Sequence, residues 1–348
     1  MNTLNTSVVL PLDYDADGDI DLFVGSRSVP MQYGLNPNSF IYQNDGKGAF
    51  KDVTASVAPQ LKELGMVRDA SLSDVNKDGK KDLVIVGDWM APVTLLAKGA
   101  KFEKADNGLE EYTGFWGAIK VLDVDGDGDN DMVLGNMGEN FTLHTQLDAP
   151  LKIWVKDFDK NGSIDKILTK TINEKDSPVF LKREMAEQFP ALKKQILQHA
   201  EYAKKSLQDL FPSDVLEGSL TKTVGYCKSI VAINDGKGKF MVVALPEVAQ
   251  LSCINAIEQA DVNHDGKPDL IIGGNYTGFI PQLAMIDASR GNVLINKGKG
   301  QFEVLTNQES GFVLNGEIKQ ILPVKVKNQT EYLALINNEV PRLFALKK

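Results

Sequence analysis

The sequence predicts an all-β protein, a β-propeller of about six four-stranded blades within one domain spanning residues 1–348. Three observations predict this fold. A short acidic phrase occurs five times, β-type runs flank its copies, and a glycine-rich hairpin phrase recurs between them. No single blade of this kind buries both of its faces, so the array is expected to close into a ring.

The acidic phrase is Asp-x-Asp/Asn-x-Asp/Asn-Gly-x-x-Asp. It occupies residues 13–21, 74–82, 123–131, 157–165 and 261–269. Oxygen-bearing side chains at positions 1, 3, 5 and 9 and a glycine at position 6 suit a tight loop around Ca²⁺. The closing acid stands at position 9 and not 12, and the flanks such as DLVIVG are β-type, which argues against an EF-hand.

The phrase predicts about five Ca²⁺ sites, with position 7 contributing a backbone carbonyl. The predicted metal-binding residues are Asp13, Asp15, Asp17, Asp19, Asp21, Asp74, Asn76, Asp78, Lys80, Asp82, Asp123, Asp125, Asp127, Asp129, Asp131, Asp157, Asp159, Asn161, Ser163, Asp165, Asp261, Asn263, Asp265, Lys267 and Asp269. The formal net charge is −9, which argues against nucleic-acid binding, and five bound Ca²⁺ would bring it to about +1.

The hairpin phrases YQNDGKGAF, INDGKGKF and INKGKGQF each predict a strand, a glycine-rich turn and a second strand. Combined with the acidic loops, they give six modules, and a seventh blade within 135–155 or 212–232 is the alternative. The modules are expected to begin near Ser7, Met66, Trp116, Leu151, Leu251 and Glu317. The third module is short, and the last lacks the acidic phrase.

Residues 176–211 break the β rhythm. Apolar residues recur there at helical spacing, from Leu192 to Leu210, and predict a helical insertion between the calcium strand and the closing hairpin of the fourth blade. A cap over an exposed blade edge is the favoured role, and a docking surface for a partner domain is the alternative.

These phrases resemble the FG-GAP/VCBS-type propellers, which include the integrin α-subunit head and the cartilage acidic proteins. The resemblance is closest to bacterial surface proteins that pair such propellers with an ASPIC/UnbV domain, and it covers nearly the whole chain. It rests on DYDADGDIDLFVGSRSVP, NDGKGAFKDVT, GDWMAP, FWGAIKVLDVDGDGDNDMVLGNMGEN and DFDKNGSIDKIL. The literal Phe-Gly…Gly-Ala-Pro signature is absent, and only Ala91-Pro92 is similar to it.

The resemblance implies a non-catalytic binding or scaffold module for a protein partner, located outside the cell or on the outer-membrane surface. A signal peptide and a membrane span are not expected in this sequence. A glycan-binding, lectin-like propeller is the alternative, and a polysaccharide lyase or hydrolase is a weaker third. Scattered histidines, His144 among them, and the absence of a nucleophile elbow or zinc spacing argue against an enzyme. Whether Cys227 and Cys253 pair is left open.

Loops that leave the second strand of each module should emerge opposite the calcium loops. They carry arginines, amides and aromatics that suit a site for a protein partner or a glycan. The predicted ligand-binding residues are Arg27, Tyr33, Arg68, Trp89, Trp116, Asn136, Tyr276 and Arg290. Packing between blades is the alternative role for the tryptophans, and pairing with Asp69 or Asp88 is the alternative for Arg27 and Arg68.

Overall fold

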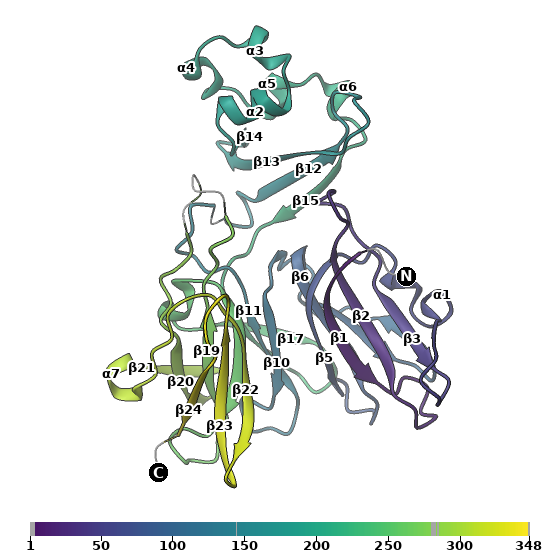
Figure 1. Cartoon of the computed structure of the whole chain (residues 1–348), viewed down its shortest axis with the longest axis vertical. Coiled ribbons are helices and arrows are strands. Elements are labelled where there is room, and N and C mark those ends of the chain that lie inside the picture. The colour runs from purple at the N-terminus through teal and green to yellow at the C-terminus, as the bar shows by residue number, and fades with distance from the viewer. Residues whose placement is uncertain (1–3, 144, 280–282, 284, 347–348) are drawn as a thin grey trace.

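The computed structural model describes residues 4–143, 145–279, 283 and 285–346, and it contains six antiparallel sheets (Figure 1). Sheet 1 consists of β1 (Asn5–Leu12), β2 (Asp21–Ser28), β3 (Phe40–Asn44) and β4 (Phe50–Asp52). Sheet 2 consists of β5 (Met66–Ser73), β6 (Asp82–Met90), β7 (Val93–Ala97) and β8 (Phe102–Lys104), with β9 (Gly114–Phe115) paired to β6. His144 and parts of the 273–291 loop lie outside the described residues.

Sheet 3 consists of β10 (Ala118–Leu122), β11 (Asp131–Gly135), β16 (Ile230–Asn234) and β17 (Phe240–Ala244). Sheet 4 consists of β18 (Ile254–Ala260), β19 (Asp269–Gly274), β20 (Asn292–Gly298) and β21 (Gln301–Leu305). Sheet 5 consists of β22 (Ile318–Val326), β23 (Gln329–Ile336) and β24 (Arg342–Ala345). Short helices lie between strands: α1 (Thr54–Val57), η1 (Pro59–Leu61), η2 (Glu247–Gln250) and α7 (Asn307–Ser310).

The first strands of sheets 1 to 5 line one central channel, but within the described residues sheet 5 is not packed on sheet 1, so the expected ring is open there. Residues of β1, β5, β10, β18 and β22 line the same cavity, and each sheet packs on the next in chain order. The all-β, propeller-like fold predicted from the sequence is therefore confirmed. Apolar side chains fill the spaces between sheets, as where Val8, Leu10 and Phe23 of sheet 1 meet Val67 and Ile85 of sheet 2.

The sixth sheet is an insertion and not a blade of the same ring. Its strands are β12 (Leu151–Lys156), β13 (Asp165–Ile172), β14 (Lys175–Pro178) and β15 (Leu220–Val224), in the order β14-β13-β12-β15. All four come from the segment between β11 and β16, so this inserted sheet leaves and rejoins sheet 3. Figure 1 shows it standing beyond the end of the propeller.

This topology corrects the predicted boundaries of two modules. The hairpin phrase INDGKGKF forms β16 and β17 and pairs with β11, so it closes the third module and not the fourth. The acidic loops of the third and fourth modules are close in the sequence because the insertion follows β11, the second strand of the third module. The other two strands of that module come after the insertion. Helices do follow the fourth acidic loop, and they lie between β14 and β15: α2 (Lys182–Gln188), α3 (Leu192–Gln195), α4 (His199–Tyr202), α5 (Leu207–Leu210) and α6 (Ser213–Leu216).

The helices cover the outer face of the inserted sheet. Phe158, Phe189 and Phe211 form one aromatic cluster with ring centroids 5.0–6.2 Å apart, and Trp154 packs on it. The opposite face of the sheet carries Leu151 and Ile153 and points toward the propeller. The inserted sheet is therefore a two-layer unit with its own small core.

Hairpin asparagines connect neighbouring sheets at the calcium-loop end of the propeller. Asn234 Nδ2 donates to the Val75 carbonyl of sheet 2 at 2.8 Å, and Asn296 Nδ2 donates to the Val124 carbonyl of sheet 3 at 2.8 Å. Both amides also donate to a carbonyl in their own sheet's acidic loop. Each asparagine therefore joins two adjacent blades through buried hydrogen bonds.

Glycines at the end of the second strands allow neighbouring sheets to approach closely. A Cβ on Gly135 would lie 2.4 Å from the Ile254 carbonyl oxygen of sheet 4, and one on Gly273 would lie 2.9 Å from Ile318 of sheet 5. The Ile254 carbonyl belongs to the backbone and cannot move aside as the end of a flexible side chain can. Glycine is therefore the residue that fits at position 135.

We predict that Gly135→Ala lowers the free energy of unfolding by about 2 kcal/mol, because sheets 3 and 4 must separate to admit the methyl group. Denaturant unfolding followed by tryptophan fluorescence measures the change. Gly225→Ala is the control, since its nearest neighbour is the end of the Leu147 side chain at 3.1 Å. Equal effects of the two substitutions would contradict the prediction.

Candidate functional site

The five acidic loops share one hydrogen-bonded frame. The position-1 aspartate accepts a bond from the amide of the glycine at position 6 in every copy, for example Gly79 N to Asp74 Oδ2 at 2.8 Å. The position-9 aspartate accepts a bond from the amide at position 2 in every copy, as from Val124 N to Asp131 Oδ2 at 2.8 Å. The repeated spacing thus fixes the loop conformation with its own carboxylates.

In sheets 1 to 4 the position-9 aspartate also accepts a bond from the third strand of its sheet, whereas Asp165 of the inserted sheet accepts one from the Gln188 side chain. The second oxygen of Asp131 accepts the Asn234 amide at 2.8 Å, and that of Asp82 accepts the Ala97 amide at 2.8 Å. Asp21 and Asp269 make the same bond with Asn44 and Asn296. Burial of these carboxylates disfavours their charged form and raises the pKa of Asp131 to about 6.

Three of the loops bring three carboxylates together. Ligand oxygens lie within 4.8 Å of one another in three groups: Asp13 with Asp15 and Asp17, Asp123 with Asp125 and Asp127, and Asp157 with Asp159 and Asp165. Asp15 Oδ1 and Asp125 Oδ1 are buried and accept no hydrogen bond within the described residues. Burial, followed by repulsion from Asp127, raises the pKa of Asp125.

Unbonded buried oxygens in a cluster of like charges fit a hard cation, so these three loops can hold a metal ion. The loops at 74–82 and 261–269 have asparagine at position 3, and its amide donates to the position-5 carboxylate. They therefore place two carboxylates and one amide at positions 1, 3 and 5, as the loop at 157–165 does with Asn161, whereas the loops at 13–21 and 123–131 place three carboxylates there. Loops in neighbouring sheets also touch, since Lys77 of sheet 2 pairs with Asp129 of sheet 3.

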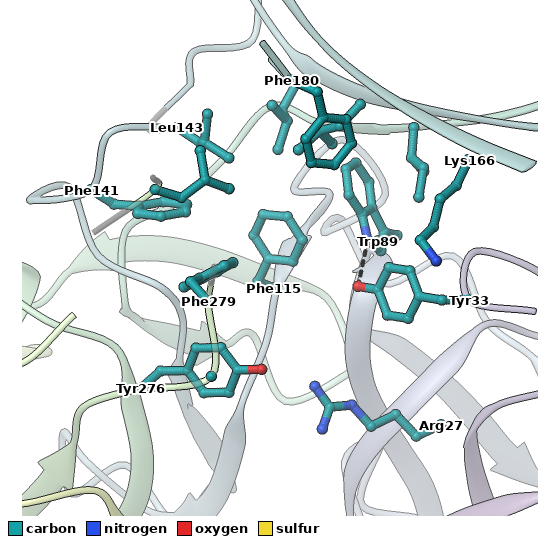
Figure 2. A pocket seen from close by; sticks show the side chains of 15 residues that line it. Arg27, Tyr33, Trp89, Phe115, Phe141, Leu143, Lys166, Phe180, Tyr276 and Phe279 are labelled. Carbon is teal, nitrogen blue, oxygen red and sulfur yellow. Dashed lines mark hydrogen bonds between the residues drawn. The ribbon is translucent and has the colours of Figure 1, made fainter. Parts of the chain in front are cut away.

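A second candidate site lies at the opposite end of the channel, beneath the inserted sheet. A pocket of about 260 Å³ opens there (Figure 2). Its lining comes from widely separated segments: Arg27, Tyr33, Trp89, Phe115, Phe141, Leu143, Leu151, Ile153, Lys166, Leu168, Phe180, Tyr276, Gly278, Phe279 and Leu283. The propeller and the insertion each supply one side of it.

Aromatic contacts fix the shape of this pocket. Trp89 packs edge-on against Phe115 with centroids 4.9 Å apart, and Phe279 lies against both Phe141 and Tyr276 at 5.0 and 4.9 Å. The indole N–H of Trp89 donates to the Tyr33 hydroxyl at 3.0 Å. The ring faces therefore have set orientations, which suits a binding surface.

Two cations border the aromatic pocket. Figure 2 shows the Arg27 guanidinium directed toward Tyr276 and the Lys166 side chain reaching toward Tyr33. Arg27 Nε and Nη2 both donate to Asp88 Oδ2 at 3.0 Å, and Arg68 Nη1 lies 3.5 Å from Asp88 Oδ1. Asp88 thus positions two arginines at once, as the pairing alternative for Arg27 and Arg68 predicted.

A polar cavity of about 610 Å³ continues from this pocket into the channel. Arg27, Tyr33 and Tyr276 belong to both spaces, and the polar cavity adds Arg68, Asn255 and Lys319. Arg68 Nη2 donates to Asn255 Oδ1 at 3.1 Å. An apolar pocket and a hydrogen-bonding cavity therefore meet at the channel mouth.

The structure brings together five of the eight predicted ligand residues: Arg27, Tyr33, Arg68, Trp89 and Tyr276. The prediction for Trp116 is wrong, since this side chain is fully buried and donates to the Tyr112 carbonyl at 3.0 Å. Asn136 is a buried clamp, which accepts the Phe115 amide and donates to the Tyr226 carbonyl at the base of the insertion. Arg290 is exposed and lines neither space.

Sequence reasoning missed Phe141, Lys166, Phe180 and Phe279. The sequence predicts a fourth blade in place of the inserted sheet, so it does not predict that the inner face of this sheet covers the channel mouth. The two cysteines are both free and buried, and burial raises the pKa of each thiol to about 11. In the described residues, no helix is long and apolar enough to cross a membrane.

Comparison with known proteins supports the repeat assignment. The family model for the FG-GAP-like repeat matches residues 13–85 and 74–134. No curated protein matches the sequence. Nothing in the comparisons bears on a likeness to proteins with an ASPIC/UnbV domain.

Two solved structures have a similar course of the chain. One is an Agrocybe aegerita lectin described as recognising non-reducing terminal N-acetylglucosamine, with 16% identity, a TM-score of 0.34, and coverage of 95% of this chain and 75% of the lectin. The other is the V. cholerae biofilm matrix protein Bap1, with 9% identity, a TM-score of 0.36, and coverage of 99% and 69%. At these TM-scores neither bears on what this chain binds. Residues 13–134 of the chain match the FG-GAP-like repeat, and the sheets have a propeller-like arrangement.

Proposed function

We propose that this protein is a calcium-stabilised, non-catalytic binding module that works outside the cell and holds a sugar residue of a glycan at the channel mouth. The aromatic pocket beneath the inserted sheet carries the proposal. A monosaccharide has an apolar C–H face and a hydroxyl rim. The pocket offers oriented rings, and the adjoining cavity offers Asn255, Arg68 and tyrosine groups for hydrogen bonds.

The calcium part of the proposal rests on the acidic loops. Each ion would neutralise carboxylates that otherwise repel one another and would hold the loop between the first and second strands of a sheet. Ions bound only by the folded state stabilise it by mass action. Millimolar calcium outside the cell suits exposed loops of this kind, which supports an extracellular location.

We predict that chelation with excess EDTA lowers the melting temperature by roughly 10 °C, since several sites release their ions together. Differential scanning calorimetry measures the shift. Readdition of Ca²⁺ should restore the original transition. A melt that is identical with and without EDTA would show that calcium does not stabilise this fold.

We predict that Asp125→Asn weakens the calcium response more than Asp19→Asn. Asp125 has a buried oxygen without a partner and belongs to a carboxylate group, whereas Asp19 stands at position 7, where the backbone carbonyl serves as ligand. The readout is the Ca²⁺ concentration that gives half of the thermal shift. It should rise for Asp125→Asn alone, and a larger rise for Asp19→Asn would be inconsistent with the assigned ligand positions.

We predict that Trp89→Ala lowers glycan affinity at least about tenfold, because the pocket loses a ring that also orients Tyr33. A glycan array in Ca²⁺ identifies the ligand, and calorimetric titration gives the affinity. The matched control is Trp154→Ala, which removes an indole from the helix-covered face of the inserted sheet. Equal binding by both variants would place the ligand elsewhere.

A protein scaffold is the second candidate, and the uncovered faces of the two end sheets favour it. On sheet 1, Val9 is 53% exposed and Phe50 is 47% exposed, beside the stacked rings of Phe40 and Tyr42. On sheet 5, Leu343 is 49% exposed and lies in one cross-strand row with Leu333 and Leu322. Both faces carry an exposed apolar patch, so we propose that sheet 5 of one copy packs on sheet 1 of another.

Self-association is tested by sedimentation equilibrium over a range of protein concentrations. The wild-type protein should show oligomers that Phe50→Asp removes, since the substitution places a charge in the contact. Lys51→Asp, on the same short strand, is the matched control. A wild-type monomer at all concentrations would refute this scaffold model.

A further inference from the structure

We propose that the channel-mouth site selects acidic sugars, with the carboxylate of a uronic acid held between the propeller and the inserted sheet. This inference rests on the proposed glycan site and names the class of sugar. The argument starts from charge, since the chain as a whole has a formal charge of −9 but its channel mouth is lined by cations.

The lining of the two joined spaces is basic. Arg27, Lys166, Arg68 and Lys319 face them, and no carboxylate does so among the described residues. Two acidic side chains, Asp88 and Glu317, pair with these cations but do not line either space. Asp88 is shared by Arg27 and Arg68, and Glu317 pairs with Lys319. Lys166 forms no ion pair with any other described residue, so positive charge remains at the mouth.

Deeper in the channel the acids are already engaged. Glu258 accepts a bond from Lys120 Nζ at 2.6 Å, and Asp69 accepts the Ile119 amide at 3.0 Å. Neither borders the mouth. Asp69 also attracts Arg68, its neighbour in the chain, so Asp88 and Asp69 together offset the two arginines. Among the residues that the structure describes, the lysines on the inner face of the inserted sheet are the cations left without an acid.

The inserted sheet contributes a buried lysine without a partner. Lys222 is 9% exposed, and its Nζ has no hydrogen-bond partner in the described part of the chain. It pairs across the sheet with Ile153, and directly opposed residues project from the same face. Ile153 lines the aromatic pocket, so Lys222 extends from the inner face of the sheet toward the propeller.

Burying a charged ammonium group without a partner costs free energy, and burial therefore favours the neutral form of the amine. Burial lowers the pKa of Lys222 to about 8, against an opposing attraction from Asp88. Asp88 already binds two arginines, so it does not neutralise Lys222 as well. An anion entering the pocket would supply a charge-assisted partner for the exposed Lys166, and it would offset the charge of Lys222, which lies behind the lining of both spaces.

The ligand class follows from combining these groups with the rings. A neutral sugar would use the aromatic faces and leave Lys166 and Lys222 without a partner. A uronate carries a carboxylate on the same ring, so both parts of the site are occupied by one residue. The pocket volume of about 260 Å³ suits a single ring of this size.

The test uses three probes with the full chain in Ca²⁺: methyl β-glucuronide, its neutral methyl ester, and N-acetylphenylalanine as an aromatic acid that resembles a peptide end. Titration calorimetry should give at least about tenfold tighter binding for the glucuronide than for its ester. Lys166→Gln and Lys222→Met should each reduce this preference several-fold. Lys47→Gln, in a hairpin turn outside both spaces, should leave the preference intact.

A melting curve of Lys222→Met separates function from structure. Removing an unpaired buried charge should raise the melting temperature of the ligand-free protein while the acid preference falls. A lowered melting temperature with an unchanged preference would assign Lys222 to structure and overturn its role. Lys166→Gln, at an exposed position, then still tests the cationic wall.

The other outcomes are equally decisive. Equal binding of acid and ester would keep the sugar site and overturn the acid preference. Binding of neither sugar would overturn the sugar site itself, and binding of N-acetylphenylalanine alone would assign the pocket to a protein chain end. A preference for the acid that neither lysine variant changes would overturn this placement of the carboxylate.

Discussion

The bond pattern of the position-9 aspartates is the constraint on which the rest of the structure depends. In each of sheets 1 to 4, one carboxylate accepts an amide from the acidic loop and another amide from the third strand. These carboxylates are buried, and such groups are stable only when their oxygens are bonded. One side chain thus fixes the loop, the second strand and the third strand of a blade relative to one another.

The inserted sheet adds a pocket that the repeated sheets alone do not form. It grows from the end of sheet 3 opposite the acidic loops, where Asn136 and Ser229 bond the outgoing and returning chains together at 2.9 Å. Its outer face is covered by its own helices, and its inner face covers the channel mouth. The propeller alone would present an open rim, and the insertion encloses it as a pocket with two chemically different sides.

Much of the fold could be predicted from the sequence, because the acidic and hairpin phrases are local signals with fixed spacing. The start of each module lies close to the strand observed there, from β5 at Met66 to β22 at Ile318. Which hairpin closes which sheet is a long-range property. β11 pairs with β16 across almost a hundred residues, and no spacing rule reveals such a return.

The site was predictable in part for the same reason. Arg27 and Trp89 lie at the ends of second strands, and Tyr276 closely follows one, so strand order was enough to place them on one rim. Trp116 and Asn136 follow the same pattern in the sequence, yet they are buried at the insertion's base, where packing decides their role. No motif in the sequence marks Lys222 as a site residue, because its amine is buried and unpaired only through the tertiary structure.

The central claim is that clustered carboxylates in the loops bind calcium and hold the blades that form the site. Equilibrium dialysis against radioactive Ca²⁺ tests it most directly. The account predicts at least three bound ions per chain, one for each carboxylate group, with weaker binding at the two loops that carry asparagine at position 3. A folded protein that retains no calcium at millimolar concentrations would contradict it.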